Sequence, residues 1–525
     1  MDGGADRSLG DGLAPATQVK GYRRENERLR ALYNGFRFHI GTFATMDLSN
    51  SGPKGFSTNQ PVEQTDRSQS EQIFGLLMND LLDGADHPEI WEAFPQFIQQ
   101  LPHLSSVMRD NAGLLQSPRV DVRLAFTILV AMGSAAQGDP AGALAFLEDS
   151  ATRYTESPLV QGAVFHIQSL LDPGNPKFDL KSKFCMRPFH ELDVLEGSTH
   201  LCCANWLNLS TGDMAQAEKW QDIWNSPTAE RIRASIHDGS FRHCNKVSCP
   251  AIQANKLPGH TEVAAMSPKW RMVVEQKETH LPHGPERVNL AYDKTCNLSC
   301  PSCRTEKIAA DSATRARFDQ LQERSILPML KEAKIVFITG SGDPFASKNF
   351  RNLMERLDAD AYPDLRFIIM TNAMLFNRRE WDRFPALHGR VLSLQISIDA
   401  AAGPTHELLR RGARWEVMQE NLQFAADLLH AGKVEQIHLS FTVQTENYSE
   451  MGDAVDLADR LGVTGLYFGK ITNWGTFTDQ QYRAKAVFQP AHPLHHDFVK
   501  SMRDPRLRTS RVNIGNLIDF IPVAA

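Results

Sequence analysis

Three cysteines with metal-binding spacing lie in the second half of the chain. Cys296, Cys300 and Cys303 form a C-x3-C-x2-C pattern just after the short apolar run 288–292. Iron–sulfur cubanes are usually held by four thiolates, so three thiolates leave one iron without a protein ligand. An open position separates a catalytic metal site from a closed structural one, and a small ligand with an amine and a carboxylate could chelate that iron. The alternatives are half of a zinc site and a chance grouping of cysteines.

The trio resembles the signature of the radical S-adenosylmethionine (SAM) superfamily. The resemblance implies that Cys296, Cys300 and Cys303 hold a [4Fe-4S] cluster whose open iron binds the amino and carboxylate groups of SAM. It also implies that reduction of the cluster cleaves SAM to methionine and a 5′-deoxyadenosyl radical, which abstracts hydrogen from a substrate. An electron donor such as flavodoxin or ferredoxin belongs to this chemistry. Ser302 departs from the family, which usually has an aromatic residue there, near the adenine.

A second group of cysteines lies upstream, in residues 173–252, and consists of Cys185, Cys202, Cys203, Cys244 and Cys249. Gly197, between the first two, fits a tight turn between two strands that carry ligands. The layout resembles the SPASM/twitch auxiliary-cluster domain of radical SAM enzymes, in a one-cluster form placed before the core instead of after it. The resemblance implies a second [4Fe-4S] cluster, held by Cys185, Cys202, Cys244 and Cys249, in which Cys203 could replace Cys202. A structural zinc site with four cysteine ligands is the alternative.

From residue 287 onwards, short apolar runs alternate with helical stretches, which predicts parallel strands joined by crossover helices. The expected strands are 288–292, 335–339, 367–371, 392–398, 436–444 and 466–469. Six such units predict an α/β fold, a partial (βα)6 TIM-like barrel, which is also the fold that the resemblance implies. Ligands in such barrels bind at the carboxyl ends of the strands.

The second expected strand runs into a Gly-Ser-Gly-Asp-Pro segment that contains Gly340, Gly342 and Asp343. This segment resembles the Gly-Gly-Glu-Pro motif of the family, which meets the SAM amino group, with an acid that is one carbon shorter. Glycines allow the backbone to approach a ligand closely. An ordinary Gly/Asp/Pro turn is the alternative.

The fourth expected strand directs polar residues to one side, and Ser397 and Asp399 are the candidates there for contacts with the SAM ribose. Alternatively, Asp399 caps the following turn. Further on, Arg410 and Arg411 lie in a segment that resembles the family's Ile-Arg-Arg-Gly, where an arginine can pair with the SAM carboxylate. An arginine fork suits a carboxylate because it binds bidentately. Arg411 is the candidate chosen over Arg410.

The composition argues against several classes of protein. The 525 residues are 42% hydrophobic and 22% charged, as in ordinary globular proteins, and a net charge of -6 gives no reason to expect nucleic acid. No apolar run approaches the ~20 residues of a membrane span, and the first residues do not resemble a secretory signal. Eight cysteines clustered between Cys185 and Cys303 therefore favour metal ligation in a reducing compartment, the cytoplasm, over disulfides.

The pattern along the chain predicts six segments. Residues 1–68 are expected to be flexible, and residues 69–172 helical, as a plain bundle or with one tetratricopeptide-like unit. The auxiliary-cluster segment (173–252), a linker (253–286), the radical SAM core (287–480) and a helical tail (481–525) follow.

The expected function is that of a radical SAM enzyme of the oxidoreductase or maturase type. Family members with auxiliary domains often modify ribosomally made peptides, and others dehydrogenate or epimerise sugars and aminoglycosides. A helical N-terminal region that binds a partner favours a peptide or protein substrate. No catalytic acid, base or tyrosine can be singled out from the sequence. A zinc-stabilised, non-catalytic scaffold on a degenerate barrel is the alternative from a different class.

Overall fold

The computed structural model describes residues 62–521, so most of the segment expected to be flexible, and the last four residues of the tail, lie outside it. The chain divides into two compact units. Of the described residues, the first comprises 62–84 and Glu89–Ser150, and the second comprises Ala85–Pro88 and 151–521.

The described part of the first unit is helical, as the sequence predicts. Its helices are α2 (Val62–Leu81), α3 (Pro88–Gln100), α4 (Leu104–Asp110), α5 (Val120–Ala136) and α6 (Pro140–Arg153). The middle of α5 is buried on all sides, and Trp91 and Phe94 of α3 belong to the same apolar core. The next helix, α7 (Pro158–Leu171), falls in the second unit, so the helical region expected at 69–172 is divided between the two units.

A nine-stranded sheet forms the centre of the second unit, in the order β2-β1-β3-β4-β5-β6-β7-β8-β9. The six expected strands are β3 (Arg287–Ala291), β4 (Ile335–Ile338), β5 (Arg366–Thr371), β6 (Val391–Ser397), β7 (Ile437–Val443) and β8 (Gly465–Lys470). They pair in parallel with one another. The expected α/β architecture of parallel strands and crossover helices is therefore confirmed.

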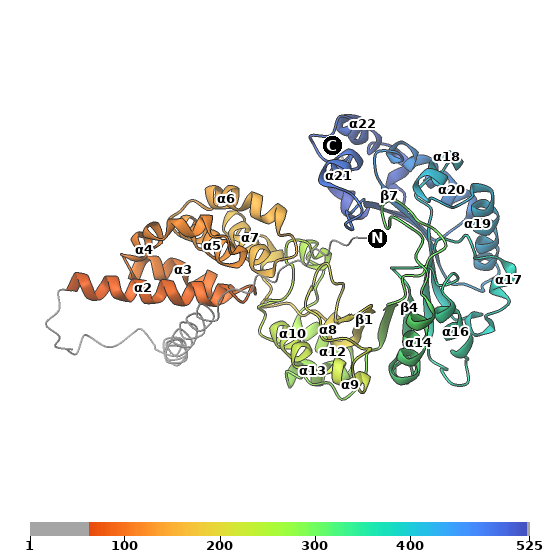
Figure 1. The fold of residues 1–525 in the computed structure, drawn as a ribbon, viewed down its shortest axis with the longest axis horizontal. Helices are drawn as coiled ribbons and strands as arrows, with labels where there is room; N and C mark the ends of the chain where they lie inside the picture. Colours follow the sequence, from red (N-terminus) through yellow and green to blue (C-terminus); the bar gives the residue numbers. More distant parts are fainter. Residues whose placement is uncertain (1–61, 522–525) are drawn as a thin grey trace, which may run out of the picture. The chain divides into compact units, whose positions relative to one another are not determined.

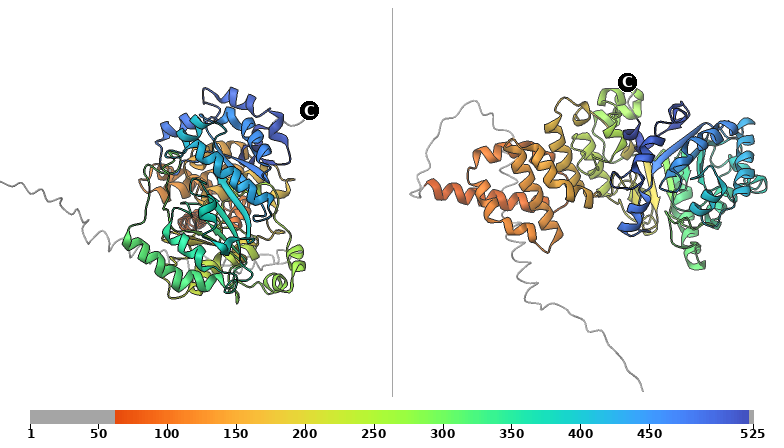
Figure 2. Two further views of the ribbon diagram at one scale, coloured as in Figure 1. Left: turned by 90° about the vertical axis from the view of Figure 1, so that its right-hand side faces the viewer. Right: turned by 90° about the horizontal axis from the view of Figure 1, so that it is seen from above.

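Helices connect these strands and cover one face of the sheet (Figure 1). They include α14 (Ser312–Leu321), α16 (Lys348–Arg356), α19 (Trp415–His430) and α20 (Met451–Leu461). Fully buried residues alternate with half-buried residues along β3, β4 and β7. One face of each strand therefore packs against the helices, and the other remains open to a ligand. Figure 2 shows the same strands and helices from two further sides.

Three further strands extend the sheet beyond the six that the sequence predicts. β1 (Glu191–Leu195) lies parallel to β3, and β2 (Ser198–His200) returns antiparallel to β1. The turn between β1 and β2 contains Gly197 at φ 73°, so the hairpin expected in the cysteine-rich segment is present and is continuous with the sheet of the core. At the opposite edge, β9 (Val512–Asn513) pairs with β8.

Residues 253–286 were expected to form a linker, and the structure corrects this interpretation. They contain two helices, α12 (His260–Met266) and α13 (Pro268–Glu275), which bury Val263 and Trp270. Ser267 caps α13 by accepting a hydrogen bond from the backbone N–H of Trp270. The Ser-Pro pair is a known helix-start signal, but the charged residues around it obscured the short apolar face. Between residues 62 and 521, no helix combines the length and apolarity needed to span a bilayer.

Candidate functional site

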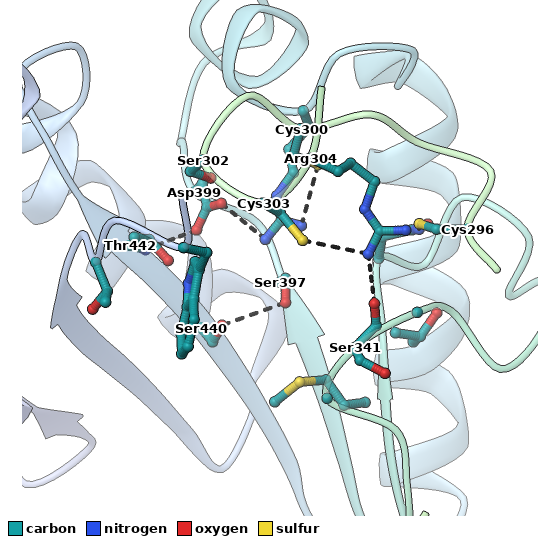
Figure 3. A pocket seen from close by; sticks show the side chains of 18 of the residues that line it. Cys296, Cys300, Ser302, Cys303, Arg304, Ser341, Ser397, Asp399, Ser440 and Thr442 are labelled. Atoms are coloured by element: carbon teal, nitrogen blue, oxygen red, sulfur yellow. Dashed lines mark hydrogen bonds and ion pairs between the residues drawn. The ribbon is translucent and has the colours of Figure 1, made fainter. Parts of the chain in front are cut away.

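The three cysteines of the second half meet in a pocket of about 260 Å³ at the carboxyl ends of the parallel strands. Figure 3 shows Cys303 between Asp399 on one side and the Arg304 guanidinium on the other, with Cys296 beyond Arg304 and Ser341 below it. The sequence predicts this gathering because the carboxyl ends of parallel strands share one edge of the sheet.

The cysteine loop is a compact turn. The backbone N–H of Cys296 donates to the carbonyl of Ile308 (2.9 Å), and that of Cys303 donates to the carbonyl of Cys300 (2.9 Å). Burial raises the pKa of the Cys296 thiol to about 11, and burial likewise raises that of Cys300. Metal ligation requires thiolates, so binding of a cluster to this loop must release protons.

Gly340 and Gly342 both line the pocket, but only the second is sterically required. A Cβ atom on Gly342 would lie 2.6 Å from the carbonyl oxygens of Asp293 and Thr295. A side chain there would push the loop away from the residues that lead into Cys296.

Asp343 is a correction to the expected SAM contacts, because its carboxylate is fully used inside the protein. Its side chain is 0% exposed and is absent from the pocket lining. Oδ1 accepts from the backbone N–H groups of Phe345 and Ala346, and Oδ2 accepts from Thr371 Oγ1 (2.7 Å) and Asn372 N (2.9 Å). The Asp343 carboxylate therefore connects the loop after β4 to the end of β5, and both of its oxygens are used within the protein.

The structure places the two arginines differently with respect to the pocket. Arg410 lines the pocket, and its Nη2 lies 2.9 Å from Asp399 Oδ2. Its Nη1 lies 3.9 Å from Cys300 Sγ. Arg411, the residue chosen from sequence, instead donates to Ser299 Oγ (3.0 Å) and to the carbonyl of Thr305 (2.6 Å) and does not line the pocket.

Ser397 and Asp399, the candidates for contacts with the SAM ribose, line the pocket. Asp399 has φ 52°, a left-handed conformation that is uncommon for aspartate. Two contacts hold this conformation: Asp399 Oδ1 accepts from Thr442 N (2.7 Å), and the Asp399 carbonyl accepts from Asn447 Nδ2 (2.8 Å).

Sequence reasoning assigned no role to several further polar residues of the pocket, among them Arg304, Asn372, Ser440 and Thr442. Asn372 Nδ2 lies 3.6 Å from Cys296 Sγ. Ser440 and Thr442 alternate along β7 as Ser397 and Asp399 do at the end of β6, so this pattern could have identified them.

A second, smaller cavity of about 40 Å³ is lined by Cys185, Cys202, Cys244 and Cys249. These are the four cysteines that the sequence grouped as one ligand set, and Cys203 is not part of the lining. Burial raises the pKa of the Cys185 thiol to about 12. Within residues 62–521, no three or more His, Cys, Asp or Glu side chains converge tightly enough to hold a single metal ion. In a cubane cluster, by contrast, each thiolate binds a different iron, so the thiols are spread around the cluster. Both cavities provide thiols arranged around a space in this way.

Residues 294–458 match the family model of the Radical SAM superfamily. The chain contains a radical SAM domain. This domain includes the cysteine loop, the glycine loop and β4 to β7, and it implies an enzyme that uses a [4Fe-4S] cluster and SAM. The match begins after the segment with the five other cysteines.

Three solved structures that are similar to this chain are the following. Streptococcus suis SuiB bound to S-adenosylmethionine matches at 15% identity over 40% of this chain and 45% of that chain, with a TM-score of 0.28. TYW1 with a lysine-pyruvate adduct matches at 14% identity over 43% and 72%, with a TM-score of 0.27. AnSMEcpe with bound AdoMet and Kp18Cys peptide matches at 16% identity over 43% and 63%, with a TM-score of 0.29. The match spans 43% and 45% of SuiB in two of its structures and 57% in the structure bound to precursor peptide SuiA. No curated protein matches the chain.

Proposed function

We propose that this protein is a radical SAM enzyme of the oxidoreductase or maturase type that carries an auxiliary [4Fe-4S] cluster and acts on a peptide or protein. The observation that carries the proposal is the convergence of Cys296, Cys300 and Cys303 on a polar pocket at the strand ends. When bound, the cluster and SAM supply a reductive cleavage of SAM that yields methionine and a hydrogen-abstracting 5′-deoxyadenosyl radical.

Different residues of the pocket bind different parts of SAM. Gly340 and Gly342 bring backbone groups close to the cysteine loop, and Ser397 and Asp399 offer hydrogen bonds to a ribose. Arg410 takes the place of Arg411 as the partner of the SAM carboxylate. Its Nε is buried without a hydrogen-bond partner in the described structure, and an unsatisfied buried donor is favourable to fill with an anionic ligand.

The second cysteine group supports an electron-transfer role for the auxiliary cluster. Cys185 precedes β1, and Cys296 follows β3, which lies parallel to β1 in register from Glu191↔Arg287 to Leu195↔Ala291. The two sites are therefore at opposite ends of the same pair of strands. Four cysteines around one cavity would leave no iron of a bound cluster open to a substrate. These residues would therefore hold a cluster suited to electron transfer and not to binding the substrate.

A second hollow of about 230 Å³ adjoins the SAM pocket and is the proposed place of the substrate. The two share Ser440, Thr442, Thr472 and Trp474. The hollow adds Tyr467, which is 41% exposed, and Trp474 is 61% exposed. Exposed aromatic side chains beside polar groups are typical of surfaces that bind peptides. The electron donor is a flavodoxin or ferredoxin. All eight cysteines are free, which supports the reducing environment of the cytoplasm.

Anaerobic reconstitution with iron, sulfide and dithionite, followed by SAM, tests the proposal. The protein should turn brown and produce 5′-deoxyadenosine. Replacing Cys296, Cys300 and Cys303 together by alanine should abolish this product and lower iron from roughly eight to roughly four atoms per chain. Equal product from parent and variant, or a colourless protein that retains zinc, would exclude the proposal. Peptides deuterated at the carbon atoms of single residues should transfer deuterium into 5′-deoxyadenosine if the substrate is a peptide.

A further inference from the structure

Arg304, the residue directly after Cys303, is held against the cysteine loop from two sides. Its side chain is only 8% exposed. Nη1 donates to the carbonyl of Lys294 (2.8 Å), and Nη2 donates to the carbonyl of Ser341 (2.5 Å). The same Nη2 lies 3.3 Å from Cys303 Sγ (Figure 3). The guanidinium group therefore connects the start of the cysteine loop, the glycine loop and one ligand sulfur.

The positive charge of Arg304 has no acidic partner. In the described range 62–521, no carboxylate lies within ion-pair distance of its guanidinium, whereas Arg410, across the pocket, is paired with Asp399. A buried, unpaired charge costs several kcal/mol, and arginine cannot relieve this cost by losing its proton. Backbone carbonyls satisfy its donors but do not neutralise it. Among the described residues, the sulfur atom in contact with it is that of Cys303, so an anionic group held by the cysteine loop is the natural counter-charge.

We propose that Arg304 sets the reduction potential of the cluster held by Cys296, Cys300 and Cys303, by stabilising the added electron. This inference rests on the proposed function. Reduction adds one electron from the flavodoxin- or ferredoxin-class donor to a group that three thiolates already make anionic, with no bond formed or broken. Net charge, hydrogen bonds to the sulfurs and solvent exposure set cluster potentials. Arg304 supplies a positive charge and a hydrogen bond to one ligand sulfur, and both favour the more negative, reduced state of the cluster, so it raises the potential and eases reduction.

The test compares the midpoint potential of the cluster in the parent with that in Arg304→Gln and Arg304→Lys. Anaerobically reconstituted full-length protein is titrated with dithionite under redox mediators and followed by electron paramagnetic resonance. The catalytic cluster is recognised because its spectrum alone changes when SAM is added. Lys307→Gln is the matched control, because it removes one positive charge from the same loop at an exposed position, where water and salt screen it.

The reduced-to-oxidised ratio of Arg304→Gln at a fixed potential should fall by about tenfold or more, which for one electron is about 59 mV. Arg304→Lys, which keeps the charge, should shift the potential by less than half as much, and Lys307→Gln should match the parent. A Gln variant with the parent's midpoint, or equal shifts in the Gln and Lys variants, would overturn the inference.

Loss of the cluster is also informative. If Arg304→Gln loses its iron and Arg304→Lys keeps it with a midpoint near that of the parent, the charge requirement stands. If both variants lose it, Arg304 acts through its bonds alone and the inference fails. A parent protein without a SAM-responsive cluster would instead sink the proposed function. If the parent has a SAM-responsive cluster and the variants keep its midpoint potential, only this inference is wrong.

Discussion

Arg410 Nη2 lies 2.9 Å from Asp399 Oδ2, with both side chains almost inaccessible to solvent. This ion pair joins the end of β6 to the turn after α18 (Gly403–Leu409). Arg410 also reaches towards Cys300, so the pair links a strand end, the cysteine loop and the proposed carboxylate site of SAM.

Replacement of Arg410, and not of Arg411, should weaken SAM binding. Arg410→Gln leaves Asp399 buried without its counter-charge, and breaking a buried pair costs about 3–5 kcal/mol. We expect SAM affinity to fall by more than about tenfold (~1.4 kcal/mol). Arg411→Gln should stay within about threefold of the parent, because Arg411 contacts only Ser299 and Thr305. Equilibrium dialysis with reconstituted protein measures both affinities, and a larger loss in Arg411→Gln would restore the assignment made from sequence.

The auxiliary site should depend on Cys202 and not on its neighbour Cys203. Only Cys202 lines the cavity with Cys185, Cys244 and Cys249. Cys202→Ala should therefore lose about four iron atoms per chain, and Cys203→Ala should lose none. Iron analysis by mass spectrometry after anaerobic reconstitution decides the point, and the opposite pattern would move the ligand to Cys203. Zinc in place of iron in the parent would identify a structural zinc site.

Asp343 should prove to be a structural residue. In the parent, Thr371 Oγ1 and Asn372 N donate to the Asp343 carboxylate. Asp343→Asn replaces one carboxylate oxygen by an amide NH2, which cannot accept these hydrogen bonds, so we expect a loss of about 2–4 kcal/mol in the free energy of unfolding. Asp343→Glu restores the family's acid but overpacks a fully buried site, which costs about 1–3 kcal/mol. Denaturant titration measures these losses. Asp311→Asn, at an exposed helix cap, is the control and should change stability by less than about 0.5 kcal/mol. Tighter SAM binding by the glutamate variant would contradict this role.

Stability should depend on pH through Asp193, which lies opposite Asn289 in the pairing of β1 with β3. Burial raises the pKa of Asp193 to about 6. Because the folded state holds this proton more tightly than the unfolded state, stability falls as pH rises above the unfolded pKa, and the loss is complete above the folded pKa. Asp193→Asn removes this pH dependence. The free energy of unfolding of the variant, relative to that of the parent, should therefore rise by about 1 kcal/mol from pH 5 to pH 7. Thermal unfolding at a series of pH values checks the sign, and a constant difference across the range would contradict it.

Features that depend on neighbouring residues in the chain were predictable. The strands β3 to β8 were placed from apolar runs, because a strand's burial follows its own alternation. The hairpin around Gly197 was predicted from one glycine between two cysteines. The linker interpretation of 253–286 failed because α12 and α13 are short and bury only a few residues each. Such faces give little periodic signal.

The chemistry of the cysteine loop was set by sequence alone, because the spacing of Cys296, Cys300 and Cys303 fixes how many thiolates one short loop can present. The direction of single side chains was decided only by tertiary structure. Arg410 and Arg411 are adjacent in the chain, yet only one reaches the pocket, since successive residues at the end of a helix point in different directions. The roles of Asp343 and Arg304 depend on atoms from distant segments, Thr371 for one and Ser341 for the other. A local sequence pattern does not show whether a polar side chain forms its hydrogen bonds within the protein or remains available to a ligand.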